Sequence, residues 1–141
     1  MRDFNTPRLY FFSAHTEINS KLKNREAHQE LGAILEERGI PFREVEGCYL
    51  GILEPSYMVV GASHGPTVDR LARLFRQQTY LVVTENDRTA YLVKPGDTYH
   101  QHLGKFVAAC TLEPSEDSWT LCDWVYYICD GSEGPDLPGG L

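Results

Sequence analysis

The sequence lacks the long apolar runs and cysteine motifs that mark several protein classes. No apolar run approaches the length of a membrane span, and the first residues have no apolar stretch typical of a secretory signal. The four cysteines show no C-x-x-C spacing, so we interpret them as reduced thiols that pack like small hydrophobic residues. A cytosolic protein is the simplest interpretation.

Clustered positive charge is also missing. The formal net charge is −7, and the lysines and arginines are scattered, which argues against nucleic acid as the main partner. A negative field mildly favours a cationic ligand. His100 and His102 alternate on one expected strand face without a third ligand nearby, so no metal site is expected.

Familiar catalytic fingerprints are absent as well. The chain has neither a Walker nor a Rossmann glycine motif. Ser63 beside His64 does not make a catalytic triad, because neighbouring residues rarely face each other in the required geometry. The chemistry that remains comes from tyrosine, carboxylate, serine and backbone groups, which suit a site that holds a polar ligand in one shape.

What the sequence does contain is the pattern of one mixed domain. Its 141 residues, 42% of them apolar, are enough to bury a core. We expect residues 1–130 to form a single α+β catalytic domain and residues 131–141, rich in glycine and proline, to form a flexible tail. One helix is expected from an N-cap at Asn24 to a stop at Gly39, and a second helix is expected to end near Gln78.

The first strands and helices follow the order β-α-β-β-α-β with an added hairpin strand, which predicts a ferredoxin-like sandwich with extra C-terminal strands. In that fold both helices cover one face of an antiparallel sheet. The other face, apolar at residues 80–83 and 91–93, then needs a cover. Two covers stay open: self-association of the subunits, for example in a ring, or the C-terminal segment at 119–128.

The segment from Gly47 to Ser56 holds the most informative residues. It is expected to form a corner between two strands, where Gly47 and Gly51 allow tight or left-handed turns. Pro55 stiffens the chain directly after Glu54, and stiff loops on a sheet often carry binding groups. A plain corner with a surface glutamate is the alternative.

Short sequence matches are spread over about residues 8–95. They are Ser13-Ala14, Asn24, His28, Gly47-Cys48-Tyr49, Glu54, Ala72-Arg73-Leu74 and residues 89–93. Together they resemble the bacteriophage S-adenosylmethionine-cleaving enzymes, long called hydrolases (SAMases) and better described as lyases. The phage enzymes have a longer loop before the glutamate. The Glu-Pro-Ser at 54–56 is also similar to a bacterial domain family of unknown function.

The resemblance implies cleavage of S-adenosylmethionine to 5′-methylthioadenosine and L-homoserine lactone, with neither cofactor nor metal. It also implies a homotrimer of ferredoxin-like subunits, with the ligand bound between neighbours. The biological setting would be the cytoplasm of an infected bacterium, where a phage protein depletes S-adenosylmethionine to blunt restriction and methylation.

Such a reaction needs mainly positioning, because the substrate carries both its nucleophile and its leaving group. We expect Glu54 to pair with the substrate ammonium, and Tyr49 to offer its hydroxyl to the substrate carboxylate or its ring to the sulfonium. Contacts with the rest of the ligand are expected from Ser13 and Ser56, and from Gln78, which is expected to reach the ligand of a neighbouring subunit. Each has a structural alternative, such as a strand-end cap, a half-buried strand tyrosine or a solvated helix end.

Other functions stay open at this stage. A trimeric module that binds an adenine nucleotide or S-adenosylmethionine without turnover fits the same features. So do a protein that inhibits a host enzyme by docking onto it, and a true hydrolase that activates water and releases homoserine. His15 and His28 are interpreted as structural or exposed.

Overall fold

The computed structural model describes residues 7–49, 52–97, 100–108, 119–122 and 125–130. The expected flexible tail at 131–141 lies outside these residues. The described elements are β1 (Arg8–Phe12), α1 (Lys21–Glu37), β2 (Phe42–Tyr49), β3 (Ile52–Val60), a short 3-10 turn η1 (Ala62–His64), α2 (Gly65–Leu74), β4 (Tyr80–Thr84), β5 (Thr89–Val93), β6 (His100–Ala108), β7 (Trp119–Cys122) and β8 (Val125–Asp130).

The described strands form a closed antiparallel barrel in the order β1-β3-β2-β7-β8-β6-β5-β4. The expected ferredoxin-like sandwich is therefore wrong. The elements from β1 to β5 occur in the expected order, but the sheet does not stop there. β6 pairs with β5, β8 with β6, and β7 joins β8 to the far edge of β2. Closure removes the free edges that an open sheet exposes.

Alternating side chains of β1 supply two separate cores. Tyr10 and Phe12 pack under the helices with residues such as Leu31 and Val68. Leu9 and Phe11 point to the other face and pack with a second cluster that includes Phe106. Burial of both faces of a strand requires apolar residues at successive positions, which explains the apolar run at residues 9–12.

The second core settles how the other face of the sheet is covered. Phe106 of β6, Tyr127 and Cys129 of β8 and Cys122 of β7 contribute to this cluster, and the rings of Phe106 and Tyr127 stack at 5.1 Å. The C-terminal strands thus do the covering, and the apolar face gives no reason for self-association. Burial in this cluster raises the pKa of the Cys129 thiol to about 11, so the thiol stays protonated at neutral pH.

The helix α1 begins four residues earlier than expected. Its N-cap is Ser20, whose hydroxyl accepts a hydrogen bond from the Lys23 N–H at 3.1 Å, so the expected N-cap at Asn24 is wrong. The stop at Gly39 is confirmed. This glycine has φ +70°, a left-handed conformation that ends a helix without the strain of a β-carbon.

The helix α2 ends earlier than expected, at Leu74. Arg76 has φ +59° and its N–H bonds back to the Arg73 carbonyl, so the chain has left the helix before Gln78. The expected helix end at Gln78 is therefore wrong. The buried face of α2 is formed by Val68, Leu71 and Ala72, as the apolar spacing predicts.

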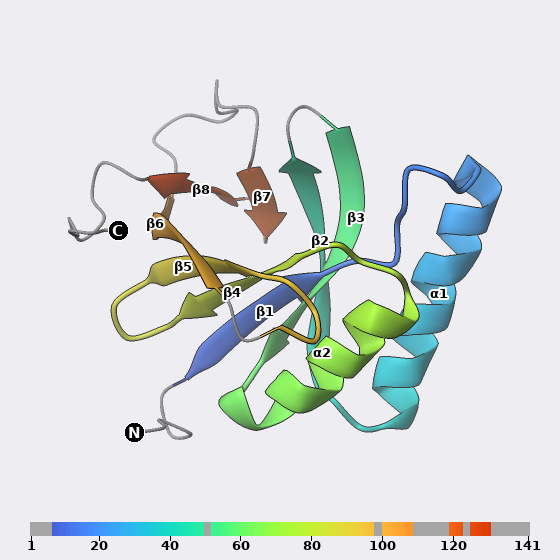
Figure 1. The fold of residues 1–141 in the computed structure, drawn as a ribbon, viewed down its shortest axis with the longest axis horizontal. Coiled ribbons are helices and arrows are strands. Elements are labelled where there is room, and N and C mark those ends of the chain that lie inside the picture. Colours follow the sequence, from blue (N-terminus) through green and yellow to red (C-terminus); the bar gives the residue numbers. More distant parts are fainter. Residues whose placement is uncertain (1–6, 50–51, 98–99, 109–118, 123–124, 131–141) are drawn as a thin grey trace.

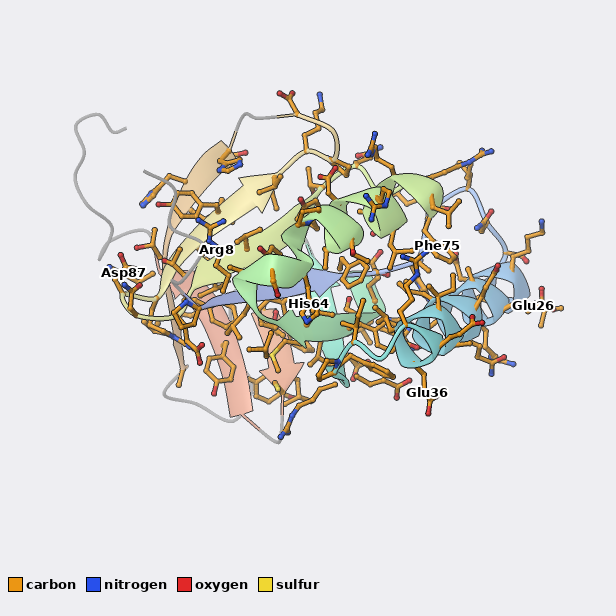
Figure 2. The ribbon with its side chains drawn as sticks, turned by 90° about the horizontal axis from the view of Figure 1, so that it is seen from below. Arg8, Glu26, Glu36, His64, Phe75 and Asp87 are labelled. Atoms are coloured by element: carbon orange, nitrogen blue, oxygen red, sulfur yellow. The ribbon has the colours of Figure 1, made fainter. Side chains whose placement is uncertain are left out.

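Both helices lie on one side of the barrel, and β5, β6 and β8 lie on the other (Figure 1). Seen from below, α1 with Glu26 and Glu36 lies toward one end of the molecule, and the β4–β5 turn with Asp87 lies toward the other (Figure 2). Among the described residues, no helix is long and apolar enough to cross a membrane.

Candidate functional site

A cavity of about 430 Å³ opens at the end of the barrel where β1 ends and β4 begins. This volume is in the range of small-molecule sites. Its described wall comes from the end of β1 with the loop at 13–18, the β2–β3 hairpin, the connection at 76–79 with the start of β4, Leu92 of β5, and β7. The cavity is therefore built by segments that are far apart in the sequence.

Four of the residues predicted for the site line this one cavity: Ser13, Glu54, Ser56 and Gln78. Gln78 belongs to the same chain as Glu54 here, so it reaches the cavity without a neighbouring subunit. Tyr49 is the last residue of β2 and pairs with Ile52 across the hairpin. Its side chain lies outside the part of the chain that the structure describes, so its role stays a prediction.

The segment 47–56 is not the corner that was expected. β2 runs to Tyr49 and β3 begins at Ile52, so Glu54 lies within a strand, directly opposite Gly47. Gly47 is not among the described glycines with positive φ, and its role is not to form a turn. Instead, the missing side chain leaves the strand beside Glu54 open toward the cavity, which Gly47 also lines.

Pro55 is tolerated inside β3 because of where β1 ends. The ladder between β1 and β3 stops at the pair Phe12–Tyr57, so no neighbouring strand needs an N–H from residue 55. The Pro55 carbonyl accepts a hydrogen bond from Ser13 Oγ at 3.0 Å. Ser13 Oγ in turn accepts one from the His15 N–H at 2.9 Å. Ser13 thus ties the loop after β1 to the strand that carries Glu54.

The loop at 13–18 is also fixed from the helix side. Asn24, only 8% exposed, accepts from the Thr16 N–H and donates to the Thr16 carbonyl, both at 3.0 Å. Gln77 donates its side-chain amide to the His15 carbonyl at 2.8 Å. Asn24 was expected to cap a helix, but its hydrogen bonds hold the loop that forms one wall of the cavity.

Glu54 is a half-buried carboxylate whose charge is not compensated. Burial raises the pKa of Glu54 above its ordinary value, and the negative charge of Glu17 raises this pKa further. Neither glutamate has an ion-pair partner among the described residues. Carboxyl groups in a cleft whose pKa is raised by burial and by a neighbouring negative charge are common at functional sites.

The two histidines differ in their surroundings. His28 stacks on Tyr57 with ring centres 4.3 Å apart, and its Nε2 lies 3.2 Å from Glu44 Oε2, which is the structural role expected for it. His15 lines the cavity instead. Burial, with a smaller effect of His28, lowers the pKa of His15, so this ring is neutral at pH 7.

Sequence reasoning missed several residues of the cavity wall. Glu17 lies in a polar loop, and Trp119 and Thr120 lie on β7, which pairs with β2 at Gly47 and Cys48. Trp119 brings an aromatic surface to the cavity, and its ring contacts that of Tyr126 edge-on at 4.9 Å. No local sequence pattern identifies Trp119 and Thr120 as site residues, because β7 reaches the cavity only through closure of the barrel.

Comparison with known protein families identifies a match. The model of the S-Adenosylmethionine lyase family matches residues 10–130, which is most of the chain and spans every wall of the cavity. A comparison with curated protein sequences found no match.

Proposed function

The chain belongs to the S-adenosylmethionine lyase family and is an S-adenosylmethionine lyase; on this premise we propose that it makes its substrate react with itself. The substrate carboxylate attacks its own γ-carbon, a C–O bond forms, and the C–S bond breaks with its electron pair going to sulfur. The products are 5′-methylthioadenosine and L-homoserine lactone. No proton is transferred in this step, so no general base is needed.

The contribution of the protein in this scheme is to hold the methionine chain bent, with the carboxylate in line with the C–S bond. Because the nucleophile and the leaving group are already in one molecule, the protein adds only the part of the proximity effect that comes from fixing the conformation of the chain. Opposite charges cancel as the ring closes, so a site with little water favours the transition state over the separated charges. Buried residues such as Phe12 and Tyr80 form part of the cavity wall and limit the access of water on that side.

The observation that carries the proposal is Glu54, a half-buried carboxylate with a raised pKa and no ion-pair partner among the described residues, inside the cavity of a chain of this family. We assign it to the substrate ammonium. A bound cation favours the charged carboxylate, so binding reverses the rise in the pKa of Glu54. Pairing with the ammonium also anchors one end of the chain that must bend.

The remaining residues are assigned to the other groups of the substrate. Tyr49 is assigned to the substrate carboxylate through its hydroxyl, or to the sulfonium through its ring. Ser56 and Gln78 are assigned to the ribose or adenine. Ser13 donates its hydroxyl hydrogen to the Pro55 carbonyl, so in this assignment it binds the nucleoside only as an acceptor.

Assembly and biology extend the same proposal. We assign the protein to a homotrimer and to the cytoplasm of a bacterium infected by a phage, where loss of S-adenosylmethionine weakens restriction and methylation. Light scattering on the purified chain measures the assembly. A mass of three chains supports the trimer, and a monomer that turns over the substrate contradicts it.

The function is tested by incubating the purified protein with S-adenosylmethionine and separating the products by chromatography. The lyase produces 5′-methylthioadenosine and homoserine lactone, and heat-inactivated protein serves as the control. Binding without product identifies a ligand-binding module instead. Homoserine that appears from the first time points, before any lactone, identifies a hydrolase.

A further inference from the structure

Glu17 is a second carboxylate on the wall of the cavity. It is solvent-exposed, and no described residue forms an ion pair with it. It lies near enough to Glu54 to act on the titration of that group, where its negative charge raises the pKa. Two like charges placed together in this way cost stability unless a cation joins them.

Hydrogen bonds hold the loop that precedes Glu17 in one position. The backbone of Thr16 is held on both its N–H and its carbonyl by Asn24, and the His15 carbonyl is held by Gln77. The Thr16 hydroxyl is buried and has no hydrogen-bond partner among the described residues. Glu17 therefore follows a fixed segment and is presented at the cavity mouth.

The charges around the cavity match those of the substrate. The wall carries Glu17 and Glu54 against one arginine, Arg76, while His15 is neutral because its pKa is lowered. S-adenosylmethionine has an ammonium, a sulfonium and a carboxylate. Each positive centre of the substrate thus has a carboxylate available, and the substrate carboxylate has a cation.

We propose that Glu17 is a specificity residue that attracts the sulfonium side of the substrate and thereby distinguishes it from the neutral thioether product. This inference rests on the proposed function for the identity of the substrate. When the C–S bond breaks, sulfur keeps the electron pair and loses its charge. The attraction by Glu17 then ends, which favours release of 5′-methylthioadenosine.

The kinetic signature of this role follows from the charge change. A carboxylate beside the sulfonium stabilises the bound substrate at least as much as the transition state, in which the positive charge is already fading. Removing it therefore raises KM and leaves kcat unchanged or slightly higher. Because Glu17 is exposed, its effect weakens as salt is added.

The test compares Glu17→Gln with Glu36→Gln. The second variant is a matched change at an exposed glutamate near the C-terminal end of α1 (Figure 2). Steady-state kinetics gives KM and kcat. Calorimetry gives the Kd of sinefungin, in which a protonated amine replaces the methylsulfonium, and the Kd of 5′-methylthioadenosine. For Glu17→Gln we expect KM and the Kd of sinefungin to rise about fivefold at low salt, with the Kd of 5′-methylthioadenosine unchanged. Glu36→Gln leaves all four values unchanged.

Two results overturn the inference: equal weakening of sinefungin and 5′-methylthioadenosine by Glu17→Gln, or no change in either. Failure of the proposed function looks different. If the unmodified protein makes no 5′-methylthioadenosine, yet sinefungin binding still depends on Glu17, the lyase reaction is wrong and the selection for a positive centre stands.

Discussion

Under α1, the Tyr57 hydroxyl and the Asn24 amide have hydrogen-bond partners, whereas the cavity wall carries two carboxylates without an ion pair among the described residues. The Tyr57 hydroxyl donates to the His28 carbonyl at 2.8 Å, and both ends of the Asn24 amide are bonded to Thr16. In the part of the chain that the structure describes, no cation pairs with Glu54 or Glu17. The difference distinguishes groups that fix the fold from Glu54, a half-buried carboxylate whose charge is costly to leave unpaired.

The largest expected effect is a loss of activity when the charge of Glu54 in the cavity is removed. We predict that Glu54→Gln lowers kcat/KM about 10²-fold or more, since it removes one partner of a desolvated charge pair with the substrate. Tyr49→Phe should also lose most turnover. Product formation in steady state measures both.

Thermal unfolding is the folding control for these variants. Since the folded protein raises the pKa of Glu54, the stability associated with this group is greatest at acid pH and is lost as the pH rises through the raised value. Glu54→Gln should therefore be as stable at pH 7 as the unmodified protein, or more so. A variant that folds and keeps full activity contradicts the assignment of Glu54.

On the core side, we predict that Gly32→Ala destabilises the protein by about 1–3 kcal/mol. Alanine usually stabilises the middle of a helix relative to glycine, by about 1 kcal/mol. Here a β-carbon would overlap the hydroxyl of Tyr57, which is buried and stacked on His28. Urea unfolding measures the change.

Two control experiments test whether overlap with Tyr57 causes the loss of stability. Gln29→Ala, at an exposed position of α1, should change stability by less than about 0.5 kcal/mol. In a Tyr57→Phe background the hydroxyl is gone, so Gly32→Ala should cost less there than in the unmodified protein. Equal costs in the two backgrounds would show that the overlap with Tyr57 is not the cause.

Asn24 links the two regions, so its removal should affect both. Asn24→Ala leaves the half-buried backbone groups of Thr16 without their side-chain partner, which we expect to cost about 1–3 kcal/mol of stability and to raise KM several-fold as the loop at 13–18 loosens. Asn24→Asp keeps the acceptor and loses the donor, so its effects should be intermediate. Unfolding and kinetics are measured on the same samples. A stability loss with unchanged KM would confine Asn24 to the core.

The smallest expected effect is on the pH profile. Glu54 must be ionised to bind the ammonium, so kcat/KM should fall on the acid side at a pH above the ordinary range of a glutamate, because the pKa of Glu54 is raised. Glu17→Gln removes one cause of that rise and should move the acid limb to lower pH. In Glu54→Gln the limb should disappear. An acid limb that persists there belongs to another group.

Local patterns predicted much of the fold near the helices. The helix stop at Gly39 and the buried face of Val68, Leu71 and Ala72 need only nearby residues to be recognised. The N-cap at Asn24 failed because its side chain bonds to Thr16, a contact outside the helix, while Ser20 makes the cap. Side chains that suit a cap also suit a loop clamp, and sequence alone does not choose between them.

Closure of the barrel could not be predicted from local sequence patterns, for a related reason. β7 is only four residues long, and it meets β2 across about seventy residues of chain. A short, partly exposed strand carries little periodicity, so the open sheet was the natural expectation. The same closure brings Trp119 to the cavity. Ser13 follows the end of β1, and Glu54 and Ser56 lie in the segment 47–56 that the sequence singled out, so their place in the cavity wall was predictable without it.

The most direct test of self-reaction within the cavity is turnover in heavy-oxygen water, with early products examined by mass spectrometry. We predict that homoserine lactone appears first without label, and that homoserine formed later carries the heavy oxygen in its carboxyl group, through opening of the lactone. Label in the γ-hydroxyl of homoserine would mean that water attacked the γ-carbon, and would contradict the account.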